Sequence, residues 1–330
     1  MLTLFGQLRL TQVLDGLGAN KNGVFVLKDL GSLSGADVHA QLEKLGEREG
    51  YYRRLGDDHS VLFMDRGSTL IVTFETSRAI ARHKMGGATL GQSVAEPRDW
   101  SHLCLIAETE SWYRAPEVYA YFDDLVDDAF FEEFDHVVFY GSGMTAYAAA
   151  AYSVAAPGAT VILIQPQATL DPTIAGWDPR FSEHRRLCFT DRYGYAPDMT
   201  EGAGEVYVLY DPEQSLDAMH AALFKRPFTT LLPCRHLGAD IAGDLLSMHI
   251  LPSVLSAAAT GTFDAGLFWT FFRARRNHLP YLKRMLRRLE ADGRPGLGAM
   301  LARNAGQRHN DAQFLARAEE LSRQIEDALR

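Results

Sequence analysis

The segment Asp135–Pro166, DHVVFYGSGMTAYAAAAYSVAAPGATVILIQP, decides the fold of this chain. An apolar run at 137–140 leads into a glycine turn, an alanine-rich stretch follows at 144–156, and a second apolar run spans 160–164. Two continuous apolar runs around a stretch of strong helix formers are typical of a buried parallel β-α-β unit. Ligands bind such sheets where strands give way to helices, so the turn at 141–146 is the first place to look for a site.

Composition places the chain among globular proteins. Its 330 residues are 47% hydrophobic and 23% charged, enough for one large α/β domain. No apolar run approaches the roughly 20 residues of a membrane-spanning helix, and the first residues do not follow the pattern of a secretory signal. The cysteines, Cys104, Cys188 and Cys234, are isolated from one another. We therefore expect a cytoplasmic protein with no disulfide framework, no metal cluster and no cofactor.

The apolar patterning predicts three regions. Residues 1–60 form an N-terminal extension, residues 61–240 form the α/β core with a polar cap inserted near 167–205, and residues 241–330 are helical. The extension is predicted to contain a helix at 8–17, a strand at 24–27, a helix at 35–46 and a polar loop at 50–58. In the core, we expect strands at 61–64, 69–74, 102–107, 137–140, 160–164, 206–210 and 229–232.

These strands predict a three-layer α/β sandwich with a mostly parallel sheet of seven or eight strands. Asp65-Arg66-Gly67-Ser68 indicates a hairpin turn between the first two core strands. The stretch 75–101 contains several glycines and is predicted to be a long loop.

Charge is spread unevenly along the chain, whose net charge is −9. Residues 265–330 alone hold 13 basic and 7 acidic side chains. A predicted helix at 117–134 carries an acidic face over 123–133, and a basic run spans 273–288. The two segments are either solvated faces, a partner or phosphate site, or a pair that joins two copies in a homodimer. An acidic chain without a recognised nucleic-acid motif is not expected to bind nucleic acid.

One interpretation of the glycine turn is dinucleotide binding. Gly141, Gly143 and Ala146 match the G-x-G-x-x-G/A fingerprint of an NAD- or SAM-type site. That site requires an acidic residue at the end of the next strand, where this chain has Ile164-Gln165. The chain also vaguely resembles phosphoadenosine phosphosulfate reductases. It has neither the serine-glycine-glycine loop nor the C-terminal cysteine motif of that family.

A second interpretation starts from two matching motifs. Trp112-Tyr113 lies upstream of GSGMTAYAA at 141–149, and the two resemble a branch of the α/β-hydrolase superfamily with a Trp-Tyr pair and a turn of the form G-S-S-M-G-G-Y-A-A-L. The resemblance covers about residues 60–240. It implies the order nucleophile, acid, histidine along the chain, and on that basis Asp211 and His236 are the candidate acid and histidine.

The chain departs from that motif at its central position. Gly143 stands where the family has its nucleophilic serine, so no covalent acyl intermediate can form there. Glycine also relieves the strain of the positive φ that this position requires. The resemblance implies that Gly141 and Gly143 keep the turn open and that the amide of Met144, with that of Phe74 or Glu75, still forms an oxyanion hole. Trp112, Tyr113 and Tyr193 are candidate pocket residues.

Three functions remain open from the sequence. The first is a degenerate hydrolase-like protein, a pseudoenzyme, that binds a small anionic or carbonyl ligand or a protein partner. The second is an active acyl hydrolase or acyltransferase that uses Ser142 or another nucleophile. The third is a nucleotide-dependent enzyme with its site at the glycine turn.

Overall fold

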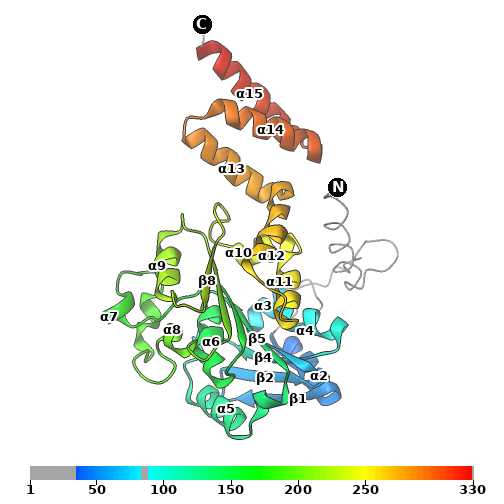
Figure 1. Cartoon of the computed structure of the whole chain (residues 1–330), viewed down its shortest axis with the longest axis vertical. Coiled ribbons are helices and arrows are strands. Elements are labelled where there is room, and N and C mark those ends of the chain that lie inside the picture. Colours follow the sequence, from blue (N-terminus) through cyan, green and yellow to red (C-terminus); the bar gives the residue numbers. More distant parts are fainter. Residues whose placement is uncertain (1–34, 83–87, 329–330) are drawn as a thin grey trace.

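A computed structural model describes residues 35–82 and 88–328. The predicted helix at 8–17 and strand at 24–27 lie outside these ranges. The sheet has eight strands in the order β1-β2-β4-β3-β5-β6-β7-β8. β2 runs antiparallel to both of its neighbours. The other six consecutive strands of this order, β4, β3, β5, β6, β7 and β8, run parallel to one another (Figure 1). The strands are β1 (Gly50–Leu55), β2 (His59–Met64), β3 (Gly67–Thr76), β4 (Trp100–Ala107), β5 (His136–Ser142), β6 (Thr160–Ile164), β7 (Glu205–Tyr210) and β8 (Thr229–Pro233).

Helices cover both faces of this sheet, which confirms the predicted three-layer α/β sandwich. They are α2 (Gly35–Glu49), α3 (Ser77–Arg82), α4 (Leu90–Ala95), α5 (Pro116–Asp127), α6 (Met144–Tyr152), α7 (Pro172–Ala175), α8 (Ala196–Met199), α9 (Ser215–Leu223), α10 (Ile241–Ser247), α11 (Ile250–Ala259), α12 (Ala265–Phe271), α13 (Leu279–Ala291), α14 (Pro295–His309) and α15 (Ala312–Ala328).

Alternation along the strands divides the core between the two faces. Val72 and Phe74 of β3 point to the face covered by α5 and α6, whereas Ile71 points to the opposite face, beneath α4 and α11. The alanines 148–151 of α6 are fully buried. Their small side chains let this helix lie close to the sheet, as the sequence predicted. A third cluster packs α2 against β2 and β4.

Several sequence predictions in the first half of the core are wrong. Residues 50–55 form the edge strand β1 rather than a polar loop, so the sheet begins before residue 61. β2 and β3 are not a hairpin, because β4 lies between them. The expected loop at 75–101 contains the end of β3 and the helices α3 and α4. The secondary structure of these segments depends on pairing with distant strands and on helix capping. Neither can be recognised from the local spacing of apolar residues.

The predicted acidic helix at 117–134 is also shorter than expected. α5 ends at Asp127, Ala129 adopts a left-handed conformation with φ 54°, and a short 3-10 helix follows at Phe130–Glu133. The predicted helical region at 241–330 begins with two separate helices, α10 and α11.

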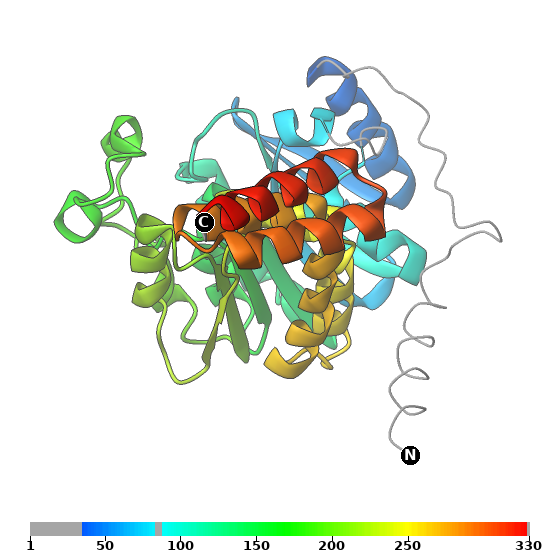
Figure 2. The same cartoon turned by 90° about the horizontal axis from the view of Figure 1, so that it is seen from above.

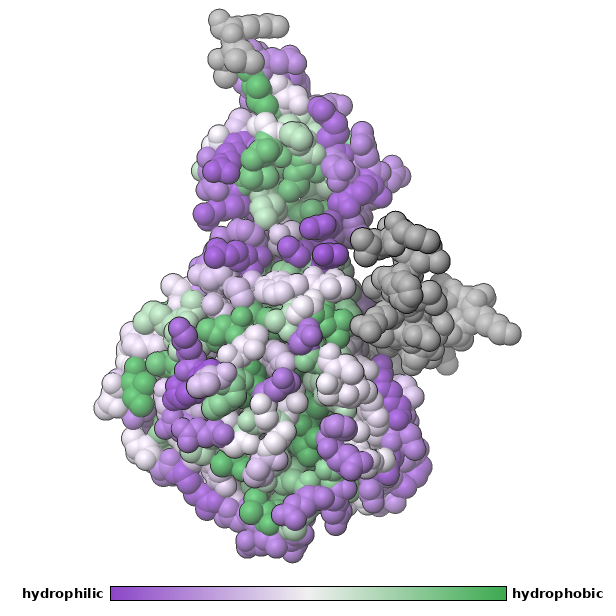
Figure 3. All heavy atoms as spheres, viewed as in Figure 1, coloured by the Kyte–Doolittle hydropathy of each residue, from purple (hydrophilic) through white to green (hydrophobic). Residues whose placement is uncertain are grey.

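The C-terminal helices leave the sheet. α10 and α11 pack on it, whereas α13, α14 and α15 project away from the α/β core (Figure 1), and α14 and α15 lie side by side (Figure 2). Apolar surface is visible on the projecting helices (Figure 3), and Leu297 and Met300 of α14 are 49% and 68% exposed. Among the described helices, none is individually long and apolar enough to cross a membrane; the α10–α11 pair, bent by 92°, passes that test of length and composition only when joined.

Candidate functional site

The glycine turn is a sharp bend between β5 and α6. Gly143 has φ 60° and ψ −125°, a conformation that side-chain-bearing residues rarely adopt, and it directly precedes the first helical residue, Met144. Its amide donates to the carbonyl of Ile164 on β6 at 2.9 Å. A Cβ placed on Gly143 would meet no atom within 4 Å. The bend therefore presents an empty position where the resemblance places the nucleophile.

Neighbouring residues hold this bend rigidly. A Cβ on Gly141 would lie 2.1 Å from the backbone carbonyl oxygen of Thr145, so only glycine fits there. The Thr145 hydroxyl accepts from the amide of Ser142 at 2.8 Å and donates to the Ser142 carbonyl at 2.9 Å. As the first residue of α6, Met144 has an amide with no acceptor inside the helix. Such a free amide is a ready donor to an anion or a carbonyl oxygen.

A cavity of about 550 Å³ opens beside the bend. It is bounded by the end of β3, the turn before α5, the start of α6 and the helices α10 and α11. Its lining is mostly apolar and consists of Phe74, Glu75, Thr76, Ala79, Leu90, Glu110, Trp112, Tyr140, Ser142, Gly143, Met144, Thr145, Gln167, Phe181, Asp240, Ala242, Gly243, Leu246 and Leu251. The predicted ligand-binding residues Gly143, Met144, Phe74 and Glu75 thus line the same cavity, whereas Gly141, which precedes Ser142, does not line it.

The ionisable groups of this lining are acidic. They include the carboxylates of Glu75, Glu110 and Asp240, and within residues 35–82 and 88–328 no lysine, arginine or histidine lines the cavity. Glu75 is buried at the N-terminus of α4, where its oxygens accept from the amides of Leu90 at 3.1 Å and Gly91 at 3.3 Å. Burial nevertheless raises the pKa of Glu75 to about 6. The described part of the lining therefore holds carboxylates and no basic side chain.

Behind Glu75 lies a buried polar cluster on β3 and β4. The Thr73 hydroxyl donates to Glu75 Oε1 at 3.2 Å and lies 2.9 Å from His102 Nε2. Burial lowers the pKa of His102 to about 3, so this ring is neutral, and burial raises the pKa of Cys104. Glu75, His102 and Cys104 offer ligand atoms within 4.8 Å of one another, as do the more exposed Glu110, Glu183 and His184. Because Glu75 already accepts two backbone amides and a hydroxyl, we interpret the buried cluster as a hydrogen-bonded support for its carboxylate.

No protein-family model and no curated protein matches the sequence. Among solved structures, the chain is similar to the thermophilic carboxylesterase EstE1 from a metagenomic library (12% identity, 73% of this chain and 98% of that chain, TM-score 0.38). It is also similar to the Pyrobaculum calidifontis esterase (13%, 72% and 97%, 0.42). A third similar structure is the capsule O-acetyltransferase of Neisseria meningitidis serogroup A (12%, 60% and 92%, 0.37).

The chain has an α/β-hydrolase-like fold. This description rests on the order of the eight strands, on the reversed direction of β2 and on the sharp bend after β5.

The candidate acid and histidine are held by contacts of the loops after β7 and β8. Asp211 follows β7, and its carboxylate accepts from the amides of Glu213 at 3.0 Å and Gly238 at 2.7 Å. His236 has φ 66°, and its Nδ1 lies 3.1 Å from Glu213 Oε2. Arg284 Nε donates to the His236 carbonyl at 3.0 Å. Neither Asp211 nor His236 lines the cavity. In this arrangement Asp211 connects the loops after β7 and β8.

The candidate pocket residues have different positions. Trp112 lines the cavity. Tyr113 is fully buried, and its hydroxyl donates to the Glu75 carbonyl at 2.6 Å, which fixes the end of β3. Tyr193 packs its ring against Tyr119 and Tyr152, away from the cavity lining. Trp112 and Tyr113 both have φ 55°, so this turn holds its side chains at a cost in backbone strain.

Sequence reasoning missed the part of the cavity contributed from β6 onward. Gln167 follows β6, Asp240 caps α10 by accepting from the Gly243 amide at 2.9 Å, and Leu246 and Leu251 come from α10 and α11. An Asp before an apolar helix is a recognisable cap signal, but nothing in the sequence locates it beside the bend.

Gln165 occupies the position where a dinucleotide site would need an acidic residue, and its side chain forms hydrogen bonds within the protein. Gln165, after β6, donates to Asp217 at 2.7 Å and accepts from the Ile241 amide at 3.1 Å. These contacts tie β6 to α9 and α10. They lend no support to the nucleotide interpretation.

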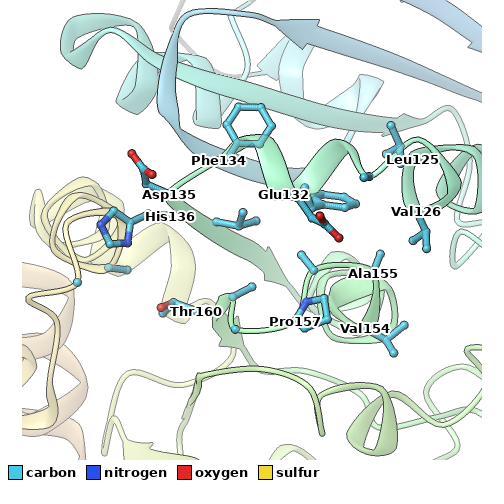
Figure 4. Close-up of a pocket in the computed structure, with 18 residues that line it drawn as sticks. Leu125, Val126, Glu132, Phe134, Asp135, His136, Val154, Ala155, Pro157 and Thr160 are labelled. Carbon is cyan, nitrogen blue, oxygen red and sulfur yellow. The ribbon is translucent and has the colours of Figure 1, made fainter.

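A second cavity, of about 410 Å³, lies where β5 and β6 begin, at the opposite ends of these strands from the bend. Figure 4 shows Asp135 and His136 on one side of it and Val126 and Val154 on the other. Glu132 and Pro157 also line this cavity. Because it shares no residue with the bend, we do not include it in the candidate site.

Proposed function

We propose that this protein is a non-hydrolytic member of the α/β-hydrolase architecture that binds a small, neutral, largely apolar carbonyl compound beside the bend at 141–144. The observation that carries the proposal is Gly143 itself. It holds the backbone conformation expected of a nucleophile, φ 60° and ψ −125°, and offers no atom that could attack.

The surroundings of the bend support binding rather than catalysis. The free amide of Met144 can donate to a carbonyl oxygen, and most of the lining is apolar. Ser142 lines the cavity, and among the described residues no histidine lines it, so the described part of the chain places no imidazole beside this hydroxyl to act as a base. The sequence predicted an anionic or a carbonyl ligand. Because the described lining holds three carboxylates, which would repel an anion, we propose a neutral carbonyl compound.

A fluorophosphonate probe tests the absence of a nucleophile. We expect no covalent label on the wild-type protein and no turnover of short-chain nitrophenyl esters. Gly143→Ser restores a hydroxyl at the bend but not an imidazole, so we expect it to remain inactive. Gly293→Ser is the matched control, because Gly293 also has positive φ and open space around its Cβ and lies in the turn after α13.

Labelling of the wild-type protein that disappears in Ser142→Ala would contradict the proposal and establish the acyl hydrolase or acyltransferase alternative. Thermal stabilisation by NAD, NADP or ATP, but by no carbonyl compound, would instead favour the nucleotide alternative.

A further inference from the structure

A group of three ionisable side chains lies where the loop after β4 meets the insertion between β6 and β7. Glu110 follows β4, and Glu183 and His184 are consecutive residues of the 3-10 helix Ser182–Arg186. Each offers a ligand atom within 4.8 Å of the other two. Glu110 and His184 are 74 positions apart in the chain, so the sequence carries no ligand spacing that indicates this group.

Both carboxylates approach the same ring nitrogen. His184 Nε2 lies 2.9 Å from Glu110 Oε2 and 3.6 Å from Glu183 Oε1. A ring nitrogen carries at most one hydrogen, so a hydrogen bond to Glu110 leaves Glu183 beyond hydrogen-bond distance. Neighbouring carboxylates also repel each other. The hydrogen bond therefore satisfies this group only in part, whereas a divalent cation attracts all three ligand atoms.

The ligand set suits a divalent transition metal. Imidazole nitrogen and carboxylate oxygen bind Zn²⁺ at about 2.0–2.2 Å, which places two ligand atoms roughly 2.8–3.6 Å apart at octahedral or tetrahedral angles. The separations of 2.9 and 3.6 Å at His184 Nε2 match this range. The side chains of Glu110 and Glu183 are 70% and 79% exposed, so both can adjust their positions and water can complete the coordination.

The three residues border a cavity of about 540 Å³ with an acidic lining. Besides Glu110 and Glu183, it is lined by three more carboxylates and by two arginines. One of these arginines, Arg114, already pairs with Asp191. An excess of carboxylates raises the local concentration of cations at such a surface.

We infer that Glu110, Glu183 and His184 form a binding site for one divalent transition-metal ion, of which Zn²⁺ is the best match. In that position the ion joins the loop after β4 to the 3-10 helix of the insertion. Trp112 and Phe181, which flank the two parts of the site in sequence, pack with ring centroids 5.0 Å apart and line the cavity at the bend. The metal therefore holds one wall of that cavity together.

Isothermal titration of the full chain with Zn²⁺, after dialysis against a chelator, measures how many ions bind. His184→Gln should bind one ion fewer per chain than the wild type. His39→Gln is the matched control and should bind as many ions as the wild type. His39 also pairs with one glutamate, Glu108, at 2.7 Å, and its side chain is 22% exposed against 18% for His184.

Glu183→Gln separates a metal site from a simple hydrogen bond. It leaves the pair of Glu110 and His184 intact but replaces the third ligand, so we expect the affinity for Zn²⁺ to fall by at least about 10-fold. Zn²⁺ should also raise the melting temperature of the wild type and not that of His184→Gln. Mg²⁺ at the same concentration should have no such effect, because imidazole is a poor ligand for it.

Two results would overturn the inference. Equal numbers of Zn²⁺ ions on the wild type and on His184→Gln would mean that this histidine binds no metal. Equal affinity of the wild type and Glu183→Gln would mean that the three residues do not act as one site. Neither result bears on the proposed function, because no carbonyl compound is present in these titrations.

Discussion

At the scale of single residues, Gly141 and Gly143 are glycines for different reasons. Gly141 lacks space, since its Cβ would overlap the Thr145 carbonyl oxygen, whereas Gly143 has open space but a conformation that disfavours a side chain. Together they keep the bend close to α6, and no side chain projects from the bend at Gly143.

We expect Gly143→Ala to lower the free energy of unfolding by about 1–3 kcal/mol, the usual strain of a side chain at such φ and ψ values. Gly141→Ala should cost more, because the backbone itself must move. Urea denaturation of both variants measures the difference. Equal losses would mean that the bend relaxes in both cases.

Glu75 makes stability depend on pH in a specific direction. Its pKa rises from 4.5 to about 6 on folding, so between these values the folded protein holds a proton that the unfolded chain has released. Its contribution to stability is therefore present below the unfolded pKa and falls as pH rises through the folded one, by about 2 kcal/mol in total.

Glu75→Gln lacks this titration. The free energy of unfolding of the variant minus that of wild type should rise with pH by about 2 kcal/mol between about pH 4 and 7, and contributions shared with His102 cancel in the difference. Denaturation curves across that range measure it, with the exposed Glu201→Gln as control. A difference that does not change with pH would mean that Glu75 is not desolvated as the structure describes.

At the scale of elements, one side chain anchors part of the segment between β6 and β7 to the core. Arg114, next to the Trp112-Tyr113 turn, donates to the carbonyls of Cys188 at 2.9 Å and Arg192 at 2.8 Å and pairs with Asp191. These bonds place residues 188–192 near the cavity wall, although their own secondary structure is slight.

We predict that Arg114→Met loosens this segment, because two carbonyls lose their donor at once. Limited proteolysis should then cut within about residues 187–193, while Arg226→Met, which removes a more exposed pair with Asp198 in the same insertion, should leave the digestion pattern unchanged. Equal digestion of both variants would mean that Arg114 is not the anchor.

At the scale of the whole molecule, opposite charges lie on separate elements. Asp124, Asp127 and Asp128 of the acidic face are exposed and make no ion pair with another described residue. Four exposed cations on α13 and the segment before it are likewise unpaired within the described residues: Arg273, Arg276, Lys283 and Arg287. Self-association through these two surfaces is one of the three alternatives that the sequence leaves open.

If it occurs, sedimentation velocity should show a dimer or larger species at low salt that dissociates at high salt, because exposed charges are screened. Lys283→Glu with Arg287→Glu should abolish it, whereas Arg303→Glu with Arg323→Glu makes the same charge change on α14 and α15 and should not. A wild-type protein that is monomeric at low salt would rule the pairing out.

The central part of the fold could be predicted from the sequence. Apolar runs at 137–140 and 160–164 around an alanine-rich stretch require a buried parallel unit, and the glycine spacing requires the bend. β1 was missed because an exposed edge strand has few buried positions to reveal it. The supposed hairpin failed because strand order depends on which surfaces pack, not on the intervening turn.

The sequence by itself determined that a buried sheet and a glycine bend occur together, since local apolar patterning and the backbone conformation at Gly143 are properties of neighbouring residues. Only the tertiary structure decided the rest of the candidate site. The loops after β7 and β8 turn Asp211 and His236 toward backbone amides and Glu213, while α10 and α11 bring Asp240, Leu246 and Leu251 to the cavity. Side-chain direction at a strand end depends on how each loop folds back over the sheet, and contacts between residues distant in sequence set that path.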